Sequence, residues 1–155
     1  MKKERLNAMN DAIYDTQKKK NIQDKENLWL GEYTEIVESE FLPYVTKAKF
    51  SAVHFYHMDF ERCKIIDMHL AKIAPEHKEC KFLKLNADKA PFFIQKLGIK
   101  VLPTICLFKD GVLMDQVIGF QDLGNKDDFK TIDLVRRLVK SDCVTPNNKM
   151  EKGFQ

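Results

Sequence analysis

The stretch at 51–66, SAVHFYHMDFERCKII, constrains the fold more than any other part of the sequence. Its first half is an apolar run rich in β-branched and aromatic residues, which is typical of a buried strand. A short charged turn follows, and apolar residues then recur at the spacing of an amphipathic helix. The stretch therefore predicts a buried strand that leads through a tight turn into a helix, which is the basic unit of an α/β domain.

The same alternation of strand and helix begins at Gly31 and continues to about residue 141. Ser39 suits a helix N-cap, and Pro91 suits the first turn of a helix that Gly98 ends. Asp110-Gly111 suits the tight turn of a hairpin. The predicted order is β-α-β-α-β-α-β-β-α, with a mixed central sheet between helices. The predicted strands cover 31–37, 50–57, 81–87, 104–109 and 112–120, and the predicted helices cover 38–48, 60–77, 90–99 and 127–141.

The composition excludes several classes of protein. With 44% apolar residues, 32% charged residues and a net charge of +3, the chain is too weakly basic for a typical nucleic-acid binder. It has no run of about 18 apolar residues that would cross a membrane, and no apolar segment that would make its N-terminus a secretory signal. The cysteines are widely spaced and form no C-x-x-C, which indicates reduced thiols in a cytosolic protein. They are Cys63, Cys80, Cys106 and Cys143.

The N-terminal residues differ in character from the rest of the chain. They are polar and lysine-rich, and Leu6, Met9 and Ile13 recur at helical spacing before three consecutive lysines, Lys18, Lys19 and Lys20. So thin an apolar stripe cannot fold alone, so the predicted helix is either a solvated arm or a contact for a partner. The predicted divisions are an N-terminal charged helix at 1–29, an α/β domain at 30–142 and a flexible tail at 143–155.

Three anchors in this pattern resemble thioredoxin. VHFYHMDFERCKII lies over the strand, W-C-G-P-C and helix of that family, KVLPTICLFKDG over its fourth strand with the preceding proline, and Gly119 over the glycine after its fifth strand. The resemblance implies a thioredoxin-like three-layer α/β/α fold with a mixed central sheet and an N-terminal helical extension. It also implies that Pro103 follows a cis peptide bond and packs against the turn at 60–63.

The resemblance does not extend to the chemistry. Phe60 stands where a thioredoxin has its attacking cysteine, whose thiolate the helix N-terminus stabilises, and Cys63 stands at the second, resolving position. Glu61 and Arg62 replace the Gly-Pro pair between them. No C-x-x-C disulfide can form, so these residues are a vestigial site and none is expected to be catalytic. Cys63 is then either a packed apolar residue or a single reactive thiol whose pKa Arg62 lowers.

Two further positions of the thioredoxin pattern are changed. Asp59 replaces the tryptophan before the attacking cysteine, and His54 replaces the buried aspartate that accepts protons. His54, His57 and His69 alternate with apolar residues and share no ligand spacing with Cys63, so we expect no metal site. The sequence also has no glycine-rich phosphate loop and no Ser-His-Asp pattern, and no cofactor is expected.

Several tracts resemble the phosducin-like proteins in particular, in the branch of phosducin-like protein 3, also called thioredoxin domain-containing protein 9. The most specific are KFLKLNADKAPF and GFQDLGNKDDF, and LWLGEYTEI matches the start of the domain in that branch. The resemblance implies a non-catalytic cytoplasmic co-chaperone that binds the cytosolic chaperonin and modulates actin and tubulin folding, with Gβγ, nucleic acid and membranes not expected as partners. The alternative is a monothiol redox or redox-sensing protein that uses Cys63.

Overall fold

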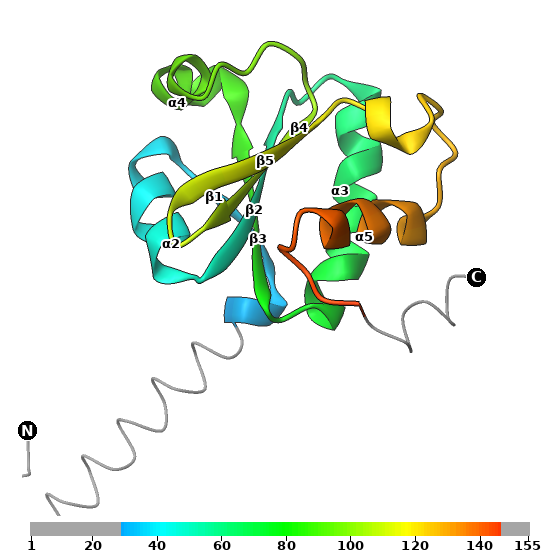
Figure 1. Ribbon diagram of the computed structural model, residues 1–155. Helices are drawn as coiled ribbons and strands as arrows, with labels where there is room; N and C mark the ends of the chain where they lie inside the picture. Colours follow the sequence, from blue (N-terminus) through cyan, green and yellow to red (C-terminus); the bar gives the residue numbers. More distant parts are fainter. Residues whose placement is uncertain (1–28, 147–155) are drawn as a thin grey trace, which may run out of the picture.

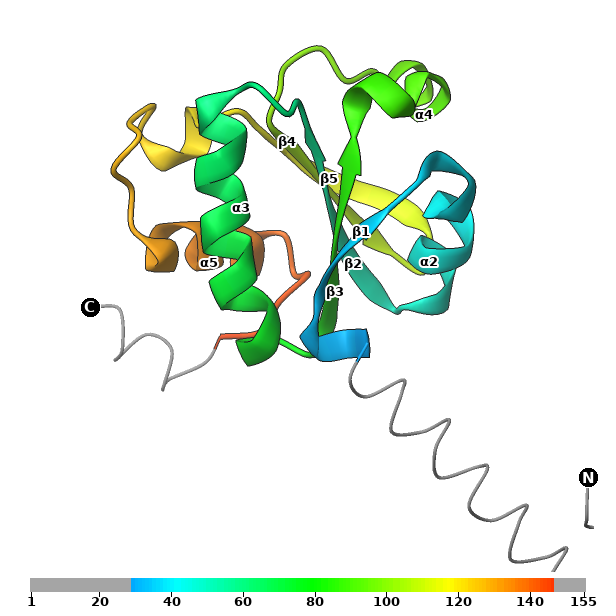
Figure 2. The same ribbon diagram turned by 180° about the vertical axis from the view of Figure 1, so that it is seen from behind.

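A computed structural model describes residues 29–146 of the chain. Its centre is a five-stranded sheet with the strand order β1-β3-β2-β4-β5, in which β1, β3 and β2 are parallel and β4 and β5 run antiparallel to their neighbours. Helices α3 and α5 cover one face of this sheet, and α2 and α4 cover the other (Figures 1 and 2). The predicted three-layer α/β/α fold with a mixed sheet is therefore confirmed.

The elements follow the predicted order, and short 3₁₀ helices precede or follow several of the α-helices. The strands are β1 (Tyr33–Ile36), β2 (Phe50–Tyr56), β3 (Cys80–Asn86), β4 (Thr104–Lys109) and β5 (Val112–Ile118). The helices are α2 (Phe41–Lys47), α3 (Glu61–Ile73), α4 (Pro91–Lys96) and α5 (Thr131–Lys140). The 3₁₀ helices are η2 (Glu38–Glu40), η3 (Ala74–Glu76), η4 (Ala87–Lys89) and η5 (Gln121–Leu123).

The central strand β2 is buried on both faces because it lies between β3 and β4. Val53 is level with Leu83 of β3 on one side and with Cys106 of β4 on the other. A strand with helices on both faces buries alternate side chains in two separate cores, which explains its near-continuous apolar run. Ala52 belongs to the core beneath α3 and α5, and Phe55 belongs to the core beneath α2 and α4.

The turn predicted from local residues is correct, whereas two predicted helix starts are wrong. Asp110 and Gly111 both have positive φ values, 51° and 82°, which confirms the tight hairpin turn. The prediction that Ser39 caps a helix is wrong, because Val37 holds the N-cap position of η2 and Glu40 that of α2. The last helix begins at Thr131 and not at 127, because the Asp133 carboxylate accepts the Lys130 backbone N–H at 2.9 Å and fixes the start there.

The core extends past residue 142, where the flexible tail was predicted to begin. Cys143 and Val144 are buried in the core beneath α3 and α5, and the Thr145 N–H donates to the Glu79 carboxylate at 2.9 Å. The tail prediction is therefore wrong for the first residues of that segment. Of the predicted N-terminal helix at 1–29, all residues but Trp29 lie outside the described residues, as does the tail from 147.

A buried lysine holds the start of the domain against the sheet. Lys81 in β3 has no exposed surface, and its ammonium donates to the carbonyl oxygens of Trp29 and Glu32 and to the Thr34 hydroxyl. The same ammonium lies 4.6 Å from the centre of the Trp29 ring.

In residues 29–146, no helix is both long and apolar enough to cross a membrane.

Candidate functional site

The vestigial thiol site lies where β2 gives way to α3. The turn at 57–60 joins the two elements, and Phe60 is the N-cap residue of α3 with an extended backbone. Its ring is 45% exposed and stacks on the His57 ring, with 4.4 Å between ring centres. The N-cap position, where a helix N-terminus would stabilise a thiolate, therefore carries a hydrocarbon ring and no attacking nucleophile.

Cys63 lies one turn further into α3 and is almost completely buried. Its sulfur accepts the His57 backbone N–H at 3.4 Å, which favours the thiolate. Burial opposes this effect and is stronger, so the pKa of the Cys63 thiol is raised. Cys63 therefore behaves as a small packed side chain with little thiolate at neutral pH.

The Arg62 side chain turns away from this thiol. Its Nε donates to the Asp127 carboxylate at 2.9 Å, and a terminal nitrogen donates to the Asn125 carbonyl at 3.2 Å. The guanidinium also lies over the Phe120 ring, 4.5 Å from its centre. The interpretation in which Arg62 lowers the pKa of Cys63 is wrong, because Arg62 instead ties the start of α3 to the loop before α5.

A polar network that the sequence analysis missed lies on the same face of α3, four residues beyond Cys63. The Asp67 carboxylate accepts the Tyr33 hydroxyl at 2.5 Å, lies 3.1 Å from Nδ1 of the fully buried His54, and lies 3.5 Å from the Lys84 ammonium. Burial lowers the pKa of His54. Burial alone would raise the pKa of Asp67, but hydrogen bonds from His54 and Tyr33 outweigh this effect and lower it. The network thus holds an anionic Asp67 close to the thiol, and its charge adds to the rise in the Cys63 pKa.

Apolar side chains are exposed around this end of the sheet. The Leu102–Pro103 peptide bond is cis, as predicted, and Figures 1 and 2 place the loop that leads into β4 near the start of α3. Met58 is 64% exposed, and Val101, which precedes the cis bond by one residue, is 44% exposed. Met58 and Phe60 are thus exposed apolar side chains at the position where a thioredoxin carries its reactive sulfur, and the charged Asp59 and Glu61 are exposed beside them.

The histidines occupy structural positions. His69 is buried, with Nδ1 2.6 Å from the Thr131 hydroxyl, and the partly exposed His57 has Nε2 3.3 Å from the Asp88 carboxylate. Within residues 29–146, no group of three or more His, Cys, Asp or Glu side chains is placed to hold a metal ion.

Comparison with known proteins identifies the family. A thioredoxin family model matches residues 32–130. Thioredoxin domain-containing protein PLP3B of Arabidopsis thaliana is 50% identical over 78% of this chain and 53% of that protein. Human thioredoxin domain-containing protein 9 is 44% identical over 100% of this chain and 67% of that protein, and phosducin-like protein 3 of Drosophila melanogaster is 45% identical over 87% and 68%. The chain belongs to the phosducin-like branch of the thioredoxin family.

The solved structures that resemble this phosducin-like chain show its fold alone and do not indicate its function. The long form of thioredoxin f from spinach chloroplast has a TM-score of 0.64 and is 21% identical, over 77% of this chain and 93% of that one. The phosducin-like chain spans about half the length of the Arabidopsis relative and two thirds of the human one. The predicted resemblance to the branch of phosducin-like protein 3 is confirmed.

The thiols of this phosducin-like chain are expected to resist alkylation while it is folded. All four cysteines are free and buried, and burial raises the pKa of Cys106 to about 12 and that of Cys143 to about 11. Iodoacetamide at pH 8 should therefore modify few thiols in the native protein and all four in urea, as measured by intact mass. Rapid modification of Cys63 in the native protein, at the rate of a free thiol, would show that the burial found here does not protect it.

Proposed function

We propose that this phosducin-like chain is a non-catalytic co-chaperone in the cytoplasm, which binds the cytosolic chaperonin and modulates the folding of actin and tubulin. The observation that carries the proposal is Phe60 at the N-cap of α3, with Cys63 buried behind it. A thioredoxin fold without an accessible thiol is suited to binding and not to disulfide exchange. Relatives named phosducin-like protein 3 support the choice of partner.

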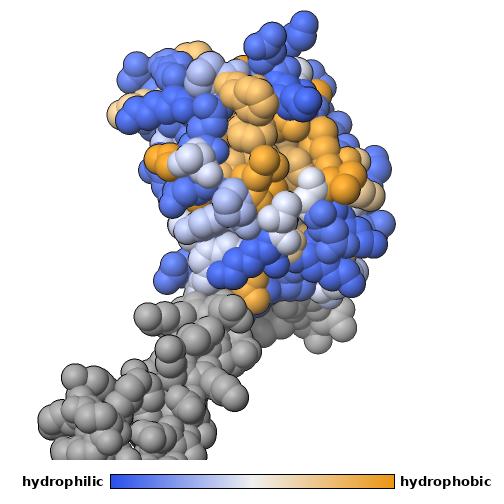
Figure 3. Space-filling view, turned by 90° about the vertical axis from the view of Figure 1, so that its left-hand side faces the viewer, coloured by the Kyte–Doolittle hydropathy of each residue, from blue (hydrophilic) through white to orange (hydrophobic). Residues whose placement is uncertain are grey.

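Exposed apolar surface supports a protein as the partner. Figure 3 shows apolar side chains gathered in a hollow on the side of the molecule that carries α2, α4 and the β4–β5 hairpin. Exposed apolar residues on these elements include Leu42, Phe92, Val112 and Met114, each more than half exposed. Exposed apolar patches of this kind commonly mark sites of interaction with other proteins.

Deleting residues 1–28 is expected to weaken binding to the chaperonin about ten-fold or more while the domain stays folded. The sequence places an apolar stripe and three lysines in this segment, and we expect the domain of residues 29–146 to fold without it. A cut before Trp29 keeps the contacts that Lys81 makes with the start of the domain. Biolayer interferometry on purified cytosolic chaperonin measures binding, and circular dichroism checks the fold. A truncated domain that binds as well as the full chain would place the contact on the domain itself.

The three lysines of that segment can be tested separately. Changing Lys18, Lys19 and Lys20 to Glu should slow association more than it speeds dissociation, because peripheral charges act mainly on encounter and are screened by salt. The matched control changes Lys78, Lys96 and Lys100 to Glu, which alters the net charge equally on the domain surface. A full chain that shows no binding at low salt would refute the proposed function.

A further inference from the structure

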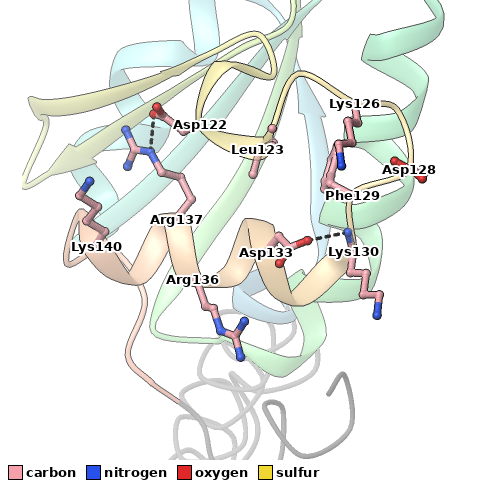
Figure 4. A pocket seen from close by; sticks show the side chains of 11 residues that line it. Asp122, Leu123, Lys126, Asp128, Phe129, Lys130, Asp133, Arg136, Arg137 and Lys140 are labelled. Atoms are coloured by element: carbon pink, nitrogen blue, oxygen red, sulfur yellow. Dashed lines mark hydrogen bonds and ion pairs between the residues drawn. The ribbon is translucent and has the colours of Figure 1, made fainter.

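The region between η5 and α5 forms a hollow on the side of the molecule opposite α4 (Figures 1 and 4). Its walls are η5, the loop at 124–130 and the outer face of α5, and charged side chains line most of it. The loop leaves η5 through Gly124, whose φ of 84° is left-handed. Neither Phe60 nor Cys63 lines this hollow.

Some of these charges are already used inside the protein. Arg137 is only 9% exposed, and its guanidinium pairs with Asp122 at 2.7 Å and with Asp115 at 2.9 Å. It also donates to the Ser141 hydroxyl and to the Gln116 carbonyl. Asp133 accepts the Lys130 backbone N–H at the start of α5. These groups hold the walls in place and have little charge left for a ligand.

The charges that remain are mostly positive. The ammonium groups of Lys126, Lys130 and Lys140 and the guanidinium of Arg136 are exposed, and none has an ion-pair partner within residues 29–146. Of the carboxylates that line the hollow, Asp128 and Asp133 likewise have no ion-pair partner in that range, and Asp133 caps the start of α5. Arg136 and Lys140 are four residues apart on α5, so they project from one face of the helix about one turn apart. Both side chains line the hollow, and in Figure 4 that of Arg136 points away from Asp122 and Leu123.

We propose that this hollow binds an acidic segment of a partner protein, with the side chains of Arg136 and Lys140 meeting its carboxylates. A guanidinium can take a carboxylate through two parallel hydrogen bonds, and the lysines add charge without fixed geometry. A nucleic acid fits less well, because Phe129 is buried and the hollow offers no exposed ring on which a base could stack.

The test measures binding of the full chain to a fluorescein-labelled peptide of alternating Glu and Ser, by fluorescence anisotropy at about 50 mM salt. Reversing two peripheral charges in Arg136→Glu/Lys140→Glu should weaken binding about ten-fold. The matched control is Lys96→Glu/Lys100→Glu, which changes the net charge equally, keeps the four-residue spacing and lies at α4 on the other side of the sheet. That control should change the affinity less than about two-fold, and a Gln–Ser peptide should not bind.

Two outcomes would overturn the inference. Equal losses in both double variants would mean that the peptide senses only the net charge of the chain. A single-stranded oligonucleotide of equal charge that binds more tightly than the peptide, and loses that affinity in Arg136→Glu/Lys140→Glu, would assign the hollow to nucleic acid. Neither result bears on the chaperonin contact proposed for residues 1–28, so the two proposals can fail separately.

Discussion

The Phe60→Cys variant is expected to reduce insulin disulfides catalytically with dithiothreitol, whereas the unaltered chain should show no turnover above the uncatalysed background. Residue 60 is the N-cap of α3, where the helix dipole and free N–H groups lower the pKa of a thiol. Each unit by which that pKa falls toward neutrality raises the thiolate fraction about ten-fold. The new thiol would stand in C-x-x-C spacing with Cys63, so we expect a rate gain of about ten-fold or more.

Two variants separate the new thiol from other effects of the change. Phe60→Ser removes the ring without adding sulfur and should stay inactive, and Phe60→Cys/Cys63→Ser should lose the turnover because no internal sulfur can resolve the mixed disulfide. Turnover by the unaltered chain that Cys63→Ser abolishes would instead establish the monothiol redox function and refute the non-catalytic one. A slow, stoichiometric reaction of Cys63 with glutathione is compatible with the non-catalytic function.

The fold could be predicted from the sequence because its signals are local. The apolar run at 51–56 and the helical spacing after Phe60 each depend on neighbouring residues, and so does the turn at Asp110-Gly111. Helix starts were less predictable, because a side chain such as Ser39 caps a helix only if the backbone leaves it at the right position. The burial of Cys143 and Val144 was missed because it depends on how the chain returns to the core after α5.

The candidate site was predictable only where a motif marks it. Phe60 and Cys63 occupy known positions in a strand, turn and helix pattern, and the burial of Cys63 one turn into the helix followed from that placement. The partners of Asp67 could not be found in this way, because Tyr33 and Lys84 come from two other strands. Its position four residues after Cys63 on a helix is the one local signal that both side chains share a face.

Lys81 shows the same limit most clearly. In CKFLKLN it shares one face of the strand with Leu83 and Leu85, and a lysine is rarely buried on such an apolar face, yet it has no exposed surface. The reason is tertiary: the start of the domain crosses this face of β3 and supplies three oxygen acceptors to the ammonium. The pattern of the strand cannot show that a segment far away in the sequence covers it. The carbonyl of Trp29, which accepts from the Lys81 ammonium, lies 52 positions earlier in the chain.

Changing Lys81 to Met is expected to lower the free energy of unfolding by about 2–3 kcal/mol at pH 7. Methionine fills a similar volume but leaves the Trp29 and Glu32 carbonyls and the Thr34 hydroxyl without their donor. It also removes the contact of the ammonium with the Trp29 ring. Urea denaturation followed by circular dichroism measures the loss, and Lys89→Met, at an exposed lysine of η4, is the control that should change little.

The pH dependence of this loss tests the burial of the charge directly. Burial lowers the pKa of Lys81 from 10.5 to about 8 in the folded chain. Between these two values the unfolded chain binds the proton more often than the folded one, so the free energy of unfolding rises with pH. Lys81→Met has no titrating group there, and other groups that titrate in this range cancel between the two proteins. The difference between the unaltered chain and Lys81→Met should therefore widen from pH 7 to pH 10 by about 2–3 kcal/mol, at about 1.4 kcal/mol for each unit of pKa shift. A difference that stays constant or narrows over this range would mean that the ammonium is stabilised by its oxygen acceptors as well as it is by water.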